Sequence, residues 1–129
     1  MSVRSIRSTL ALTAASLLVV ALVATAVAAP QARHTPTRAT KTVKGISTHW
    51  SPTIVRISVG DTIKWKAISN THTVTSYGTN WHFNHSLPQG ATMSHRFSHA
   101  GTFRFRCMIH STLTNGVCSG MCGKVVVSG

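Results

Sequence analysis

Residues 101–110 read G-T-F-R-F-R-C-M-I-H, and the alternation within this stretch decides the fold. Phe103, Phe105 and Cys107 fall on one face of an extended strand, because successive strand residues point to opposite sides. The two arginines between them fall on the other face. The pattern predicts a strand with one buried face and one solvent-facing face.

Short runs of β-branched and aromatic residues, separated by turn residues, recur from residue 43 onward. Together with the stretch above they predict strands over 53–59, 62–67, 71–76, 93–97, 102–107 and 124–128. No helical period of useful length lies between them. The sequence therefore predicts an all-β domain over residues 43–129, built as an antiparallel β-sandwich.

The first 28 residues have the organisation of a secretory signal peptide. Arg4 and Arg7 precede an Ala/Leu/Val-rich stretch that ends in A-V-A-A-P at 26–30. A basic start, an apolar middle and a small-residue exit favour export and cleavage after Ala28. An uncleaved membrane anchor is the alternative, because about 20 apolar residues can span a bilayer. The expected location is the periplasm or cell envelope, or the outside of the cell.

Residues 29–42 are rich in Pro, Thr and basic side chains and show no apolar period. This composition predicts a flexible basic leader between the signal peptide and the domain. The chain's 129 residues allow one ordinary domain beyond these two segments.

The chain is strongly basic, with 13 Lys and Arg residues against one acid, Asp61, and a formal charge of +12. One carboxylate cannot supply paired-carboxylate catalysis or a calcium cage. The charge favours partner proteins with acidic docking surfaces, and an anionic envelope surface is a second candidate. No nucleic-acid-binding motif occurs, so nucleic acid is not an expected partner.

A set of soft ligands marks the C-terminal third. Cys107 and His110 stand in C-M-I-H, Met121 follows ten residues later in M-C-G-K-V, and His72 lies upstream in N-T-H-T-V. A thiolate, two imidazoles and a thioether are unusual for zinc, which prefers four N/S ligands without thioether. They match a trigonal copper site with a weak axial methionine.

Three cysteines in an exported chain leave one thiol over when two are paired. Cys118 and Cys122 are four residues apart and could close a small loop, which would leave Cys107 for the metal. Free thiols at these two positions, or one of them as another ligand, stay open as alternatives.

Other aromatic residues carry weaker signals. Four further histidines, at positions 82, 85, 95 and 99, match no metal-ligand spacing, and we expect solvated or partner-facing side chains there. Trp81 and Phe83 either form an apolar docking patch near the metal or pack under a loop.

The chain resembles the small blue copper proteins, the cupredoxins of the plastocyanin, pseudoazurin and amicyanin type. The resemblance covers about residues 46–128 and lies in the segments at 49–52, 57–65, 70–74, 83–90, 101–110 and 121–125. It implies a Greek-key sandwich and a monomer that carries single electrons between redox partner proteins without catalysing a reaction. It also implies one type 1 copper ion, whose ligands would be His72, Cys107, His110 and Met121.

Two features depart from that family. Its members usually have only a few residues between the second histidine and the methionine, and they often have Asn after the first histidine, where Thr73 stands here. The long 111–120 segment keeps open an alternative, a copper storage or delivery protein on the same fold. An enzyme would need a second metal centre or an open coordination position, and a basic envelope-binding module would use its Cys and His only structurally.

Overall fold

The computed structural model describes residues 37–129, and every structural statement below concerns that part of the chain. The expected signal peptide and most of the expected leader lie outside these residues. The first strand begins at Thr40, so the last three residues of the range expected as leader belong to a sheet. Residues 37–129 include no apolar helix long enough to cross a lipid bilayer.

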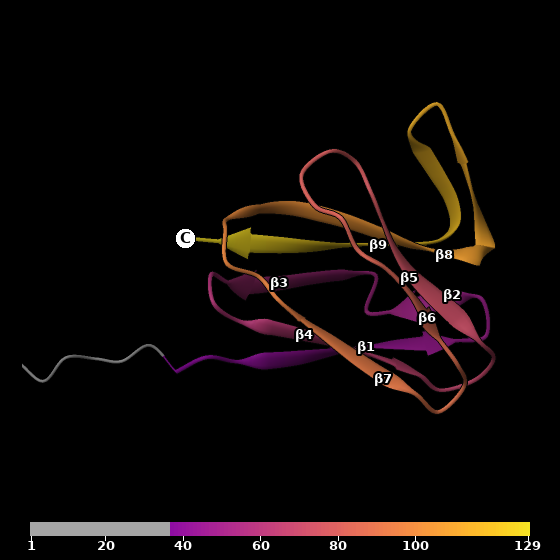
Figure 1. Ribbon diagram of the computed structural model, residues 1–129, viewed down its shortest axis with the longest axis horizontal. Coiled ribbons are helices and arrows are strands. Elements are labelled where there is room, and N and C mark those ends of the chain that lie inside the picture. The colour runs from indigo at the N-terminus through magenta and orange to yellow at the C-terminus, as the bar shows by residue number, and fades with distance from the viewer. Residues whose placement is uncertain (1–36) are drawn as a thin grey trace, which may run out of the picture. The chain divides into compact units, whose positions relative to one another are not determined.

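Two sheets form the fold, as Figure 1 shows. The four-stranded sheet has the order β2-β1-β4-β7 and consists of β2 (His49–Ser51), β1 (Thr40–Ile46), β4 (Thr62–Ala67) and β7 (Thr92–Arg96). The five-stranded sheet has the order β3-β9-β8-β5-β6 and consists of β3 (Ile54–Ser58), β9 (Val117–Ser128), β8 (Gly101–Thr114), β5 (His72–Tyr77) and β6 (Asn84–Leu87).

Both sheets are mixed, and the expectation of a purely antiparallel sandwich is wrong. β1 runs parallel to β4, with Val43 beside Trp65. β3 runs parallel to β9, with Val55 beside Val125. In each parallel pair the chain between the two strands passes through the other sheet. The residue alternation within one strand carries no information on the direction of its neighbour.

The core lies between the sheets and is rich in aromatic rings. Trp65 of β4 and Phe105 of β8 are fully buried, and their ring centroids are 5.4 Å apart across the sandwich in an edge-to-face contact. Trp50 of β2 packs against Phe105 at 5.5 Å and also approaches His72 at 5.6 Å. The aromatic core therefore reaches the end of the sandwich where His72 lies.

The segment expected as a long loop is a β-hairpin. Residues 111–120, called the hairpin arm below, pair across β8 and β9 from Ser111–Gly120 to Thr114–Val117. Asn115 and Gly116 connect the strands with φ angles of 49° and 78°, both positive, as a type I′ turn requires. Figure 1 shows the arm standing out beyond the two sheets.

The only carboxylate side chain in the sequence is used inside the fold. Asp61 accepts one hydrogen bond from the Ala39 N–H at 2.7 Å and one from the Ser58 N–H at 2.9 Å. These two bonds lower the pKa of Asp61. They tie the start of β1 to the turn between β3 and β4.

Candidate metal centre

Three side chains expected as ligands meet at one end of the five-stranded sheet. His72 begins β5, Cys107 lies in the adjacent strand β8, and His110 follows in the same strand. Their ligand atoms lie within 4.8 Å of one another. Within residues 37–129 this is the one group of three or more His, Cys or acidic side chains close enough to share a metal.

The three distances between the donor atoms are similar. The Nδ1 atoms of His72 and His110 are 3.3 Å apart. The sulfur of Cys107 lies 3.4 Å from His110 Nδ1 and 3.8 Å from His72 Nδ1. Two imidazole nitrogens and one sulfur thus converge as three corners of a triangle, the arrangement that a trigonal His2Cys site requires.

The orientation of His72 is fixed by its other ring nitrogen. Nε2 lies 2.8 Å from the carbonyl oxygen of Ser69, so an Nε2–H donates there and leaves Nδ1 with its lone pair free. Gly45 of β1 also packs against this ring, and a Cβ on Gly45 would stand 2.6 Å from His72 Cδ2. Because His72 is held on both sides, its Nδ1 stays directed at the other two candidate ligands, Cys107 and His110.

The environment also sets the charge of His72. Burial lowers its pKa, and the neighbouring His110 lowers the pKa further, while hydrogen bonds to backbone oxygens of Ser69 and Gly45 oppose both. The net effect is a lowered pKa. His72 is therefore neutral near pH 7, the form in which imidazole binds a metal.

The sulfur of Cys107 is fully buried and receives a backbone contact from the other ligand segment. The N–H of Thr73 points at Cys107 Sγ at 3.4 Å. The hydroxyl of the same Thr73 accepts a hydrogen bond from the N–H of Met108 at 2.8 Å. Thr73, where the resembling family often has Asn, therefore links the segment of the first histidine to that of the cysteine.

A break in the β8–β9 register places His110. The regular pairing shifts between Arg106 and Ser111, and such irregularities bend a strand and redirect its side chains. The Ser111 hydroxyl donates to the carbonyl of Cys107 at 2.6 Å and closes this bend. His110 is partly exposed, in contrast to the two buried ligands.

Met121 lies in β9 with its side chain buried. Its carbonyl oxygen accepts a hydrogen bond from Trp50 Nε1 at 3.2 Å, and the Trp50 ring in turn packs against His72. The Trp50 side chain thus contacts both the Met121 backbone and the His72 ring. Its role as axial ligand stays a prediction.

The structure joins Cys118 and Cys122 in a disulfide with a Cα–Cα distance of 6.1 Å. Cys107 is the cysteine left free, as the ligand role requires. The disulfide connects Cys118, which pairs with Leu113 in the outer half of the hairpin arm, to Cys122, which follows Met121 in β9.

The remaining aromatic residues pack rather than form a second site. Trp81 is buried and stacks on Phe83 with ring centroids 5.5 Å apart. His85 and His95 contact the Phe83 ring at 4.5 and 5.0 Å. Burial, followed by the nearby His85, lowers the pKa of His95. The packing alternative for Trp81 and Phe83 is the one that the structure shows.

Sequence reasoning missed the contacts of Gly45 and Ser69 with His72. A glycine inside a strand signals a close approach of another group. The signal was hidden because β1, with few apolar residues, was not predicted as a strand.

No protein-family model matches the chain, and no curated protein matches it. Solved structures do. A reduced amicyanin variant is 24% identical, with a TM-score of 0.56, over 67% of this chain and 80% of its own. A purple cupredoxin from Nitrosopumilus maritimus is 23% identical, with a TM-score of 0.53, over 67% of this chain and 98% of its own.

A Cu-containing nitrite reductase from Thermus scotoductus SA-01 is 19% identical, with a TM-score of 0.57, over 68% of this chain and 22% of its own. The match to the enzyme thus concerns a small part of that protein. Taken with the two sheets and the His–Cys–His group, these likenesses show that the chain has the cupredoxin fold, with a cluster that fits a single copper ion.

Proposed function

We propose that this protein is an exported type 1 copper protein that carries single electrons between redox partner proteins. The observation that carries the proposal is the convergence of His72, Cys107 and His110 within 4.8 Å. One thiolate and two imidazoles suit copper, and Met121 is the proposed weak fourth ligand. The site includes no carboxylate that would favour a harder metal, because Asp61 is engaged elsewhere.

Copper, when bound, supplies a one-electron couple between Cu(II) and Cu(I). The chain supplies a donor set that is held in place by its own hydrogen bonds. Ser69 orients His72, Thr73 contacts the sulfur of Cys107, and the Ser111 hydroxyl fixes the bend before His110. A frame of this kind favours the same ligand positions in both oxidation states, which keeps the cost of electron transfer low.

His110 is the proposed exit for the electron. It is partly exposed, whereas His72 and Cys107 are fully buried. Next to it, Met108 and Ile109 are 50% and 57% exposed and give the surface around His110 an apolar character. A partner that docks here comes within reach of one ligand and excludes water at the same time.

The charge of the chain supports partners with acidic docking surfaces, and we place the monomer in the periplasm, in the cell envelope or outside the cell. Cleavage after Ala28 is part of this proposal. An anionic envelope surface is the second candidate for a binding partner.

A copper storage or delivery protein is the alternative function. The hairpin arm favours it, because it replaces a short loop between His110 and Met121. The similar amicyanin structures include reduced, oxidised and Cu(I) forms, which supports the electron-carrier proposal by analogy. The similarity to a Cu-containing nitrite reductase covers 22% of that enzyme, so it supports the shared fold rather than an enzymatic role.

Visible absorption after addition of Cu(II) tests the proposal, with Cys107→Ser as the decisive variant and His99→Gln as a control away from the site. We expect an intense thiolate-to-copper band in the unmodified protein and in the control, and its loss in Cys107→Ser. Reversible one-electron reduction of the coloured form would complete the case.

The other outcomes separate the alternatives. Copper bound without the thiolate band, and released readily to a chelator, would favour storage or delivery. No copper bound at all would overturn both functions.

A further inference from the structure

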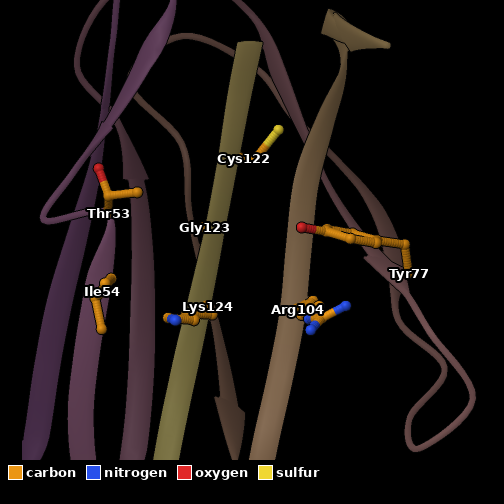
Figure 2. Close-up of a pocket in the computed structure, with 7 residues that line it drawn as sticks. All are labelled: Thr53, Ile54, Tyr77, Arg104, Cys122, Gly123 and Lys124. Carbon is orange, nitrogen blue, oxygen red and sulfur yellow. The ribbon is translucent and has the colours of Figure 1, made fainter. Parts of the chain in front are cut away.

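The outer face of the five-stranded sheet carries a pocket of about 270 Å3. Its lining comes from β5, β8, β9 and the start of β3, as Figure 2 shows. Arg104 and Lys124 are paired on neighbouring strands at its centre, and Figure 2 shows the Lys124 nitrogen on the side of Ile54 and the Arg104 nitrogens on the side of Tyr77. The pocket is separate from the His–Cys–His group, and nothing in the proposed function uses it.

Four of the lining residues form one straight row across four strands. Tyr77 pairs with Arg104, Arg104 pairs with Lys124, and Lys124 pairs with Ile54. Residues paired in this way have Cβ atoms about 5 Å apart, and two like charges in such positions repel each other. The row therefore places two cations on adjacent strands with no acidic side chain in the row beside them.

The fold has no acid to neutralise these two cations. Asp61 is the only carboxylate side chain in the sequence. Its two oxygens accept hydrogen bonds from the backbone N–H groups of Ala39 and Ser58. A second copy of the chain cannot supply the missing anion either, because it carries the same single, engaged acid. Any counter-charge comes from ions in solution or from another molecule.

We propose that this pocket binds an oxyanion, held between the Arg104 guanidinium and the Lys124 ammonium. A guanidinium presents paired N–H donors that match a phosphate or a carboxylate. The hydroxyl of Tyr77 supplies a further donor from one side of the pocket, whereas the Thr53 hydroxyl already donates to the Trp50 carbonyl at 3.2 Å. Figure 2 shows the Tyr77 ring lying across β8 with its hydroxyl directed toward β9.

The lining includes apolar surface as well as charge. Ile54, which is 47% exposed, and Cys122 line the pocket beside the two cations. Apolar walls exclude part of the water, which strengthens the attraction between the cations and a bound anion. Free phosphate and a carboxylate side chain of an acidic partner share this chemistry.

Titration of the metal-free, 15N-labelled full chain with inorganic phosphate tests the proposal without depending on copper. Sodium chloride keeps the ionic strength constant. We expect saturable shifts of the amide resonances of Arg104, Gly123 and Lys124. Arg104→Gln and Lys124→Gln should each raise the dissociation constant at least about tenfold, the loss of one charge-assisted hydrogen bond.

Arg56→Gln is the matched control, since Arg56 lies on β3 two residues after Ile54 and outside the pocket lining. It should leave the dissociation constant unchanged. Shifts that grow linearly with phosphate concentration, or an equal loss of phosphate affinity in Arg56→Gln, would overturn the proposal. Either result would mean that phosphate only screens the charge of the surface. A tri-glutamate peptide in a parallel titration identifies the source: tighter binding of the peptide assigns the pocket to a partner's carboxylate, and tighter binding of phosphate assigns it to a free oxyanion.

Discussion

Gly45 of β1 and His72 of β5 are in contact across the two sheets, and the contact leaves no room for a side chain on Gly45. A Cβ there would stand 2.6 Å from His72 Cδ2, 3.0 Å from its Nε2 and 3.1 Å from the ring of Trp50. The position of the imidazole is therefore set from the opposite sheet, by the absence of a side chain.

Gly45→Ala should displace the His72 ring. We expect a loss of about 1–3 kcal/mol in the free energy of unfolding, typical of overpacking, and weaker copper binding. Urea unfolding of the metal-free protein and a competitive copper titration measure the two effects. Lys44→Ala, at the exposed neighbouring position, is the control. Full retention of both properties in Gly45→Ala would contradict the role given to this contact.

Thr73→Val removes one hydroxyl and keeps the shape of the side chain. The N–H of Met108 then loses its acceptor, and we expect a loss of about 0.5–1.5 kcal/mol in unfolding free energy. The thiolate-to-copper band should shift, because the segments of His72 and Cys107 lose a link. Urea unfolding and the absorption spectrum measure these changes. Thr92→Val in the exposed part of β7 should change neither.

The disulfide should stabilise the fold without being needed for the metal. In the chain-entropy account, a loop closed over four residues contributes about 2 kcal/mol, which Cys118→Ser/Cys122→Ser should lose. The copper band should persist, since His72, Cys107 and His110 are held by other contacts. Disappearance of the band in the double variant would show that the disulfide holds the site together.

Gly116→Val should loosen the hairpin arm alone. A branched side chain at a φ of 78° is strained by about 1–2 kcal/mol, and the arm strands pair with each other. Hydrogen exchange should accelerate for amides of the arm and stay unchanged in the two sheets. Val117→Thr, at the neighbouring exposed position, is the control. Faster exchange throughout β5 would contradict this independence.

Asp61→Asn should lower the melting temperature at neutral pH. The amide side chain has one acceptor oxygen and cannot accept from both the Ala39 and Ser58 N–H groups as the carboxylate does. Because the pKa of Asp61 lies below its ordinary value of 3.8, the carboxylate stabilises the fold above that pH. This stabilisation is lost as the pH falls through the lowered pKa. The difference in melting temperature between the unmodified protein and Asp61→Asn should therefore narrow below pH 3.8. A constant difference at all pH values would exclude the ionised carboxylate as its cause.

The strands that the sequence predicted well are those with a clear alternation of apolar and polar residues. Residues 62–67 match β4 over its full length. β1, β2 and β6 were not predicted, because they are short or mostly polar and are recognised only by their pairing. The direction of β1 against β4 depends on a contact between distant segments, which no local pattern contains.

The candidate ligands His72, Cys107 and His110 could be inferred from residue type and spacing, and the structure brings them together. The residues that hold these ligands in place could not be inferred from the sequence. Ser69 acts through a backbone carbonyl, which every residue carries, and Gly45 acts through a missing side chain. The hairpin arm did have a signal, the Asn115–Gly116 pair, but both arm strands are largely exposed and lack the alternation that marks a half-buried strand.

The tip of the hairpin arm is a region whose length can change without changing the metal centre. The first pair of the arm, Ser111 with Gly120, stands between the two ligand segments and the tip. Because the disulfide ties Cys118 to Cys122, residues added or removed in equal number beyond the pair of Leu113 with Cys118 would leave the positions of His110 and Met121 unchanged. The reach and chemistry of the tip can therefore be altered by insertion or substitution while the spacing of the ligands in three dimensions stays the same.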